Sequence, residues 1–109
     1  MEVFLAEPAE RSLQQIFYFY SELASEEIAL KVVNGILDKV ETLNTFPERG
    51  KLEFYLSELK QGHRFIIKGN YKVIYLVGLD KVVVTDIFDT RQDPDEIKRR
   101  AEKGDTGLS

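Results

Sequence analysis

The stretch HRFIIKGNYKVIYLV, residues 63–77, decides the fold. Its two halves, residues 63–68 and 71–77, are rich in β-branched and aromatic side chains, which favour β-strands. Between them stands the dipeptide Gly69-Asn70, which is typical of a two-residue hairpin turn. The stretch therefore predicts an antiparallel hairpin.

A third strand is expected directly after this hairpin. Gly78-Leu79-Asp80 indicates a second turn, and the residues 81–88 that follow contain the run Val82-Val83-Val84. Strands joined by turns this short run in opposite directions. The three strands therefore predict an antiparallel meander.

The N-terminal part predicts a short strand over residues 2–6 and then two helices. Pro8 suits the first turn of a helix, and Ser25 is expected to cap the second helix, which continues to about Thr45. Two helices with so short a link are expected to pack as an antiparallel hairpin. Apolar residues recur at spacings of three and four on one face of each helix; they are Leu13, Ile16, Phe17, Tyr20, Leu23, Ala24, Ile28, Val32, Ile36, Val40 and Leu43.

The remaining segments are a loop, an ambiguous stretch and a final helix. Residues 46–50 contain Pro and Gly and predict a loop, whereas the segment up to Gly62 reads either as an irregular strand or as a short helical turn. Asp93-Pro94 predicts the start of a helix that runs to about Lys103, and residues 104–109 are expected to be a frayed tail. Helices segregated from an antiparallel sheet make this an α+β fold, and we expect one domain over residues 1–109.

Composition excludes several classes of chemistry. The chain has 109 residues, a formal net charge of −4, no cysteine and a single histidine. Disulfides, zinc–thiolate sites and cysteine nucleophiles are therefore excluded, and a metal site built from histidines is not expected. We expect no cofactor, no secretory signal and no contact with a membrane, since no apolar run approaches the roughly 20 residues that span one. The composition favours a cytoplasmic domain.

Both faces of the predicted hairpin are largely apolar. With the expected turn, Ile67 lies opposite Lys72 and Arg64 lies opposite Tyr75. One face is then expected to cover the helix hairpin, and the other to remain exposed as an interaction surface unless the final helix folds back over it. The first face carries Arg64, Ile66, Lys68, Tyr71, Val73 and Tyr75, and the second carries His63, Phe65, Ile67, Lys72, Ile74 and Leu76.

Three segments in this order resemble the RelE/ParE superfamily, the toxins of type II toxin–antitoxin modules. They are FPERG at residues 46–50, GHRFIIKGNYKVIY at residues 62–75, and residues 82–91; the most specific pieces are GNYKVIY at residues 69–75 and the ending FDTRQDP at residues 88–94. The resemblance implies a small cytoplasmic toxin that a cognate antitoxin neutralises by wrapping its C-terminal segment around the helices and the sheet. On the apolar face described above, the expected antitoxin contacts are Phe65, Ile67, Ile74 and Leu76.

The superfamily has two main activities, and the residues favour one of them. The RelE-like branch resembles ribosome-dependent mRNA endonucleases, which need a proton acceptor, a proton donor and cations around the phosphate. The strand that pairs with residues 71–75 supplies cations in that branch, but here those positions are Phe65 and Ile67. No Tyr follows Tyr75 and no His follows His63. A lone histidine at a strand start is expected to be a surface residue.

These departures favour the ParE-like (plasmid stabilisation) branch, which resembles inhibitors of DNA gyrase. We therefore expect a toxin that acts by binding a protein, with DNA gyrase as the favoured target, no catalytic residues and no direct binding of DNA. Two alternatives stay open. One is an mRNA endonuclease acting at the ribosome through Arg64, Lys72, Arg91 and His63; the other is a non-toxic member that only binds its antitoxin.

Overall fold

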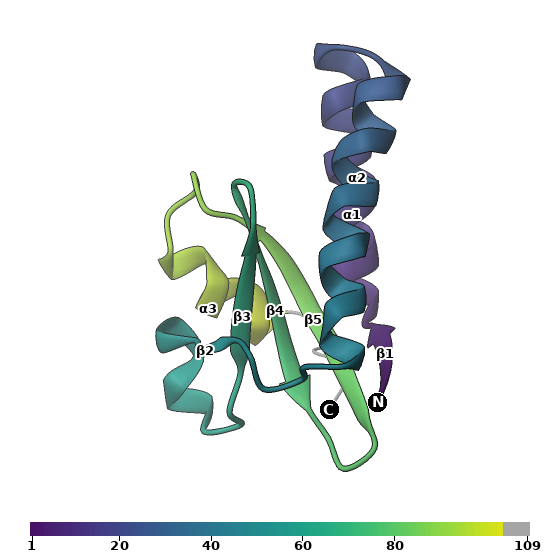
Figure 1. The fold of residues 1–109 in the computed structure, drawn as a ribbon. Coiled ribbons are helices and arrows are strands. Elements are labelled where there is room, and N and C mark those ends of the chain that lie inside the picture. Colours follow the sequence, from purple (N-terminus) through teal and green to yellow (C-terminus); the bar gives the residue numbers. More distant parts are fainter. Residues whose placement is uncertain (104–109) are drawn as a thin grey trace.

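The computed structural model describes residues 1–103 and contains one five-stranded sheet with helices on both sides (Figure 1). The strands lie in the order β1-β5-β4-β3-β2. The predicted tail, residues 104–109, lies outside the described residues. The elements are β1 (Glu2–Leu5), α1 (Glu7–Leu23), α2 (Glu26–Glu41), the 3₁₀ turn η1 (Thr42–Asn44), β2 (Lys51–Leu52), the 3₁₀ helix η2 (Phe54–Leu59), β3 (Arg64–Lys68), β4 (Tyr71–Val77), β5 (Lys81–Asp89) and α3 (Asp95–Lys103).

The predicted β-hairpin is confirmed together with its register. Arg64 pairs with Tyr75 and Ile67 with Lys72, and β5 then runs antiparallel to β4. Gly69 is the first residue of the turn and has a φ of +59°, a conformation that is strained for residues other than glycine. The hairpin follows from local sequence because turn chemistry fixes which residues lie opposite each other.

The first strand is the one part of the sheet that is not antiparallel. β1 pairs parallel with β5, Val3 lying opposite Val82, so that the whole sheet is mixed rather than a pure meander. A parallel pair needs a long crossover, and most of the chain lies between these two strands. Residue patterns mark where a strand lies but not its direction, which is why the sequence left this pairing open.

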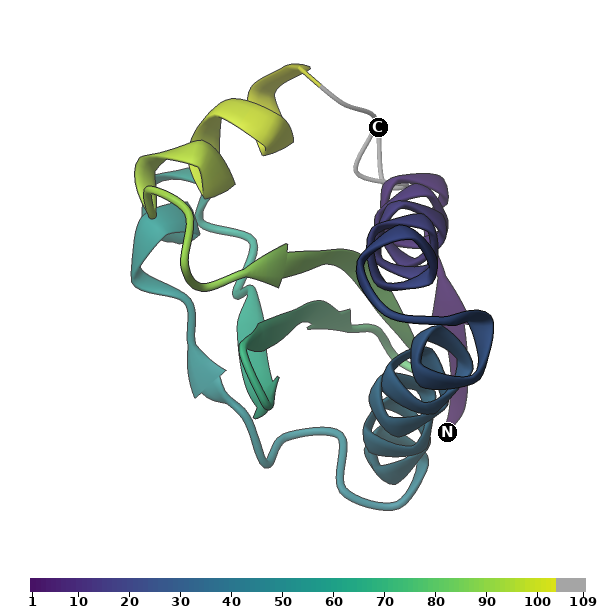
Figure 2. The ribbon, with the colours of Figure 1, turned by 90° about the horizontal axis from the view of Figure 1, so that it is seen from above.

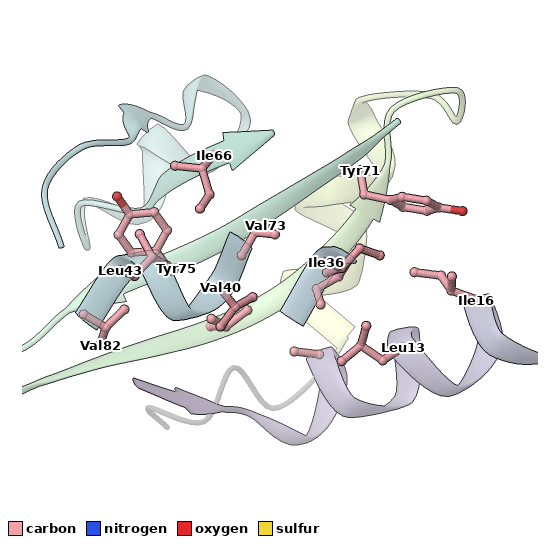
Figure 3. Close-up of a cluster of buried hydrophobic side chains, with 13 residues drawn as sticks. Leu13, Ile16, Ile36, Val40, Leu43, Ile66, Tyr71, Val73, Tyr75 and Val82 are labelled. Carbon is pink, nitrogen blue, oxygen red and sulfur yellow. The ribbon is translucent and has the colours of Figure 1, made fainter. Parts of the chain in front are cut away.

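The helix hairpin forms as predicted and covers one face of the sheet. Pro8 lies in the first turn of α1, and the Ser25 hydroxyl accepts the Ile28 N–H at 3.1 Å at the start of α2. The larger core lies between these helices and the sheet (Figure 3). Its buried residues include Leu13, Ile16, Ile36, Val40, Leu43, Ile66, Val73, Tyr75 and Val82.

The opposite face of the sheet is also covered, which corrects the expectation of an exposed face. Ile74 and Phe88 from the sheet pack with Leu56 of η2 and Ile97 of α3 in a second, smaller core. Figure 2 shows α3 and the helix hairpin on different sides of the sheet. Lys98 of α3 also forms an ion pair with Glu58 of η2. The apolar residues that sequence alone left without a partner are therefore largely buried within the chain.

The ambiguous segment before β3 contains both of the predicted alternatives, the short strand β2 and the 3₁₀ helix η2. The loop before it ends at Gly50, whose N–H donates to the buried Tyr75 hydroxyl at 2.9 Å. A Cβ at this position would lie 2.5 Å from that hydroxyl oxygen, so only glycine fits. Across residues 1–103, no helix is both long and apolar enough to cross a membrane.

Candidate functional site

The three basic residues of the nuclease hypothesis are each bound by a partner within the chain. Arg64 donates from Nη1 to the Gly50 carbonyl at 2.9 Å. Arg91 forms a two-pronged pair with Asp89, with distances of 3.0 Å from Nε to Oδ1 and 2.9 Å from Nη2 to Oδ2. These hydrogen bonds hold the pKa of Asp89 below its ordinary value. Both arginines therefore have structural partners of their own.

Lys72, the third basic residue, belongs to a buried ion pair. Its Nζ lies 3.0 Å from Oε2 of Glu53, whose side chain is almost completely buried. The same Nζ lies 4.3 Å from the centre of the Phe65 ring. The other carboxylate oxygen of Glu53 accepts the Tyr55 N–H at 3.1 Å, at the start of η2. The pair thus ties η2 to the sheet.

His63 is buried, which corrects the expectation of a surface histidine. It is 3% exposed, and neither ring nitrogen has a hydrogen-bond partner among residues 1–103. Burial lowers the pKa of the ring, although the nearby Glu53 carboxylate opposes this shift. The neutral imidazole is therefore favoured, and its nitrogens are shielded from a substrate.

This burial predicts a pH dependence of stability. Because the pKa of His63 is lower in the folded chain, the unfolded chain binds more protons, and the contribution of His63 to stability is lost as the pH falls below the unfolded value near 6.5. A His63→Gln variant lacks this titration. Chemical denaturation from pH 7.5 to 5 should therefore show the wild-type free energy of unfolding falling more steeply than that of the variant. If the unfolding free energies of the wild type and the variant fell equally with pH, His63 would not be the source of the pH dependence.

The four residues expected to contact an antitoxin lie in different environments. Ile74 is 1% exposed beneath η2 and α3, and Leu76 is also buried. Phe65 is half-buried beside Lys72, whereas Ile67 is 43% exposed near the end of β3. The structure therefore leaves Ile67 and part of Phe65 at the surface.

A groove between α1, β5 and α3 was not predicted from sequence. It consists of two cavities of about 530 and 290 Å³ that share Ser12, Gln15, Gln92 and Arg100 in their linings. Below, we call this pair of cavities the α1–α3 groove. Its walls come from segments more than 70 residues apart in the chain, which is why sequence patterns did not reveal it.

Asp86 is one of several charged residues in the wall of this groove, and its side chain is largely buried. Its Oδ1 accepts the Ser12 hydroxyl at 2.8 Å, the Arg100 Nη2 at 2.9 Å and the Ile87 N–H at 2.7 Å. Burial raises the pKa of Asp86, while Arg100 and Ser12 act in the opposite direction. The network joins α1, β5 and α3. A carboxylate placed between the apolar residues of β5 is the sequence signal that could have pointed to it.

The fold agrees with that of a solved toxin–antitoxin structure. A chain of the structure described as the chromosomal ParDE TA system from P. aeruginosa matches with a TM-score of 0.69 at 22% identity, covering 82% of this chain and 95% of that chain. Among curated proteins, no match was found. The α+β architecture is therefore the ParE fold.

The sequence defines the family more closely. The family described as the ParE toxin of the type II toxin–antitoxin system, parDE, matches residues 3–94. The chain belongs to this family of toxins. The resemblance inferred from the hairpin and the FDTRQDP segment is thereby confirmed in its ParE-like form.

Proposed function

We propose that the chain is a cytoplasmic toxin that arrests growth by binding a protein, with DNA gyrase as the target, and that a cognate antitoxin neutralises it. Membership of the ParE toxin family supports a role in a toxin–antitoxin system. The choice of mechanism rests on how the four residues of the nuclease hypothesis are bonded and buried; these are Arg64, Lys72, Arg91 and His63. Arg64 and Lys72 are bound by partners within the fold, the half-exposed Arg91 is paired with Asp89, and His63 is buried with both nitrogens shielded.

This arrangement is poorly suited to RNA cleavage. General acid–base catalysis needs a titratable group within hydrogen-bond reach of the reacting hydroxyl. Both ring nitrogens of His63 are buried, and Lys72 is committed to the buried carboxylate of Glu53. Releasing Lys72 toward a phosphate would leave that carboxylate unpaired, which is costly. Inhibition by protein binding requires no such rearrangement.

The test is induced expression in a bacterial host without antitoxin, with DNA breaks and mRNA integrity followed in the same culture. Filamentation with DNA breaks and intact mRNA is the expected result. Rapid mRNA cleavage without DNA breaks would overturn the proposal in favour of the endonuclease. Normal growth with soluble protein would leave a member that only binds its antitoxin.

For the antitoxin we propose two contact regions. The first is the exposed part of the predicted set, Ile67 and Phe65, since Ile74 and Leu76 are both buried. The second is the α1–α3 groove, because a segment lying there would touch helices and sheet together.

A Gln15→Arg variant tests the second region. Gln15 is exposed and lines both cavities of the groove, so a larger charged side chain should obstruct it. Antitoxin binding, measured by calorimetry, is expected to weaken by about tenfold or more. Gln14, its exposed neighbour that lines neither cavity, provides the matched control Gln14→Arg. Equal affinities for the two variants would exclude the groove.

A further inference from the structure

The helix hairpin is longer than the sheet that it covers. Figure 1 shows its connecting end rising beyond the β3–β4 turn. The buried residues of α1 all lie in its first ten positions, from Ala9 to Ile16. Leu23 stands two helical turns after Ile16 and so on the same face, yet it is 68% exposed. The core-facing side of α1 therefore continues into solvent.

Exposed apolar side chains gather at this end from both helices. Leu23 closes α1 and Ile28 lies in the first turn of α2, and both are exposed; Leu30 is also exposed but lies on the opposite side of α2 from Ile28. We call residues 22–30 the hairpin tip. The fold does not bury these side chains, so their apolar character contributes little to its stability. A cluster of this kind on a small domain is typical of an interaction surface.

The tip is held in a defined position. Only Ala24 and Ser25 connect the helices, and the Ser25 hydroxyl caps α2. One turn before Leu23, the Tyr20 hydroxyl lies 3.4 Å from that of Tyr71 at the start of β4, which ties the hairpin to the sheet. A rigid surface loses little conformational entropy on binding.

The charge of the tip indicates what kind of partner it fits. Glu22, Glu26 and Glu27 are exposed and adjoin the apolar residues of the tip in the chain, and residues 22–30 contain no basic residue. A second copy of the chain would bring these carboxylates together, and nucleic acid would add phosphates beside them. A protein surface with an apolar centre and a rim of Lys and Arg is complementary on both counts.

We propose that the hairpin tip is the surface through which the toxin binds its target protein, separate from the α1–α3 groove. This inference rests on the proposed function, because it assigns a surface to the target of that function. The apolar centre consists of Leu23 and Ile28, and the acidic rim steers a basic partner toward it. Target and antitoxin then contact different parts of the toxin.

The test compares a Leu23→Ser/Ile28→Ser variant with wild type on purified DNA gyrase, and also measures antitoxin affinity and growth arrest. Gyrase binding is expected to weaken by about tenfold or more, while antitoxin affinity changes by less than about twofold. Growth arrest should be lost in parallel. Leu79→Ser, at a fully exposed turn leucine, is the matched control and should behave like wild type. Since all three leucine and isoleucine sites are exposed, circular dichroism should show every variant folded.

The outcomes separate this inference from the proposed function. If the wild-type protein does not bind gyrase, gyrase is not the target. If, in that case, the double variant still arrests growth, the tip is not the target-binding surface either. Wild type and double variant that bind gyrase equally overturn the tip inference alone. The inference also fails if the double variant loses antitoxin binding, or if sedimentation shows a wild-type dimer that the double variant lacks.

Charge reversal gives a second, independent measurement. A Glu26→Lys/Glu27→Lys variant keeps the apolar centre but replaces the acidic rim. Gyrase association should become slower, and the dependence of its rate on salt should weaken. An unchanged association rate would contradict the role of the rim.

Discussion

An Ile74→Asp variant is expected to be unfolded at room temperature rather than selectively impaired in antitoxin binding. Ile74 lies in the centre of β4 and is buried with Leu56, Phe88 and Ile97. A carboxylate placed there loses nearly all of its hydration and either remains charged at a high cost or takes up a proton. The loss of unfolding free energy should exceed about 4 kcal/mol, which is exceptional for one substitution.

The matched control for this variant is Ile67→Asp, the same substitution on the neighbouring strand. Ile67 is 43% exposed, and the loss of unfolding free energy should stay within about 1 kcal/mol. Circular dichroism and chemical denaturation measure both variants. A folded Ile74→Asp protein would show that η2 and α3 do not cover this face. Ile67→Asp is thus the variant that can report on antitoxin contact without loss of the fold.

A Glu53→Gln variant should lose about 3 kcal/mol of unfolding free energy, since it breaks a buried ion pair. Lys72 would keep its charge beside Phe65 without a counter-charge, although a glutamine oxygen can still accept the Tyr55 N–H. Lys72→Met should cost at least as much, because it leaves the more deeply buried Glu53 carboxylate unpaired. Urea denaturation gives both values.

The double variant Glu53→Gln/Lys72→Met shows whether the pair acts as a unit. The double variant should lose less unfolding free energy than the two single variants together, by about 2 kcal/mol, since neither partner remains unpaired. The exposed pair of Glu7 and Arg11 provides the control, and Glu7→Gln should change stability by less than about 0.5 kcal/mol. Strictly additive losses at Glu53 and Lys72 would contradict the pairing.

The parts of the fold that depend on neighbouring residues were predictable from sequence. The register of β3 and β4 follows from Gly69-Asn70, and the start of α2 follows from its Ser25 cap. Both are local devices that operate within a few residues. The family resemblance rested on the same segments, because they combine turn residues with a particular apolar pattern.

The parts that depend on distant segments were not predictable. Ile74 looked exposed because Leu56 and Ile97, which cover it, come from a segment of ambiguous pattern and from a short helix. Lys72 resembled a free cation until Glu53, 19 residues away, was placed beside it. The α1–α3 groove, likewise, exists only once Ser12, Asp86 and Arg100 meet.

The parallel pairing of β1 with β5 has a consequence for synthesis on the ribosome. Glu2 pairs with Lys81, so β1 emerges long before its partner, whereas the helix hairpin can form from contacts close in the chain. Because β5 lies between β1 and β4, the sheet cannot be complete before β5 is available. A nascent chain that has not yet exposed β5 also lacks the wall of the α1–α3 groove. This ParE-family chain therefore acquires the α1–α3 groove only after β5 and α3 have been translated.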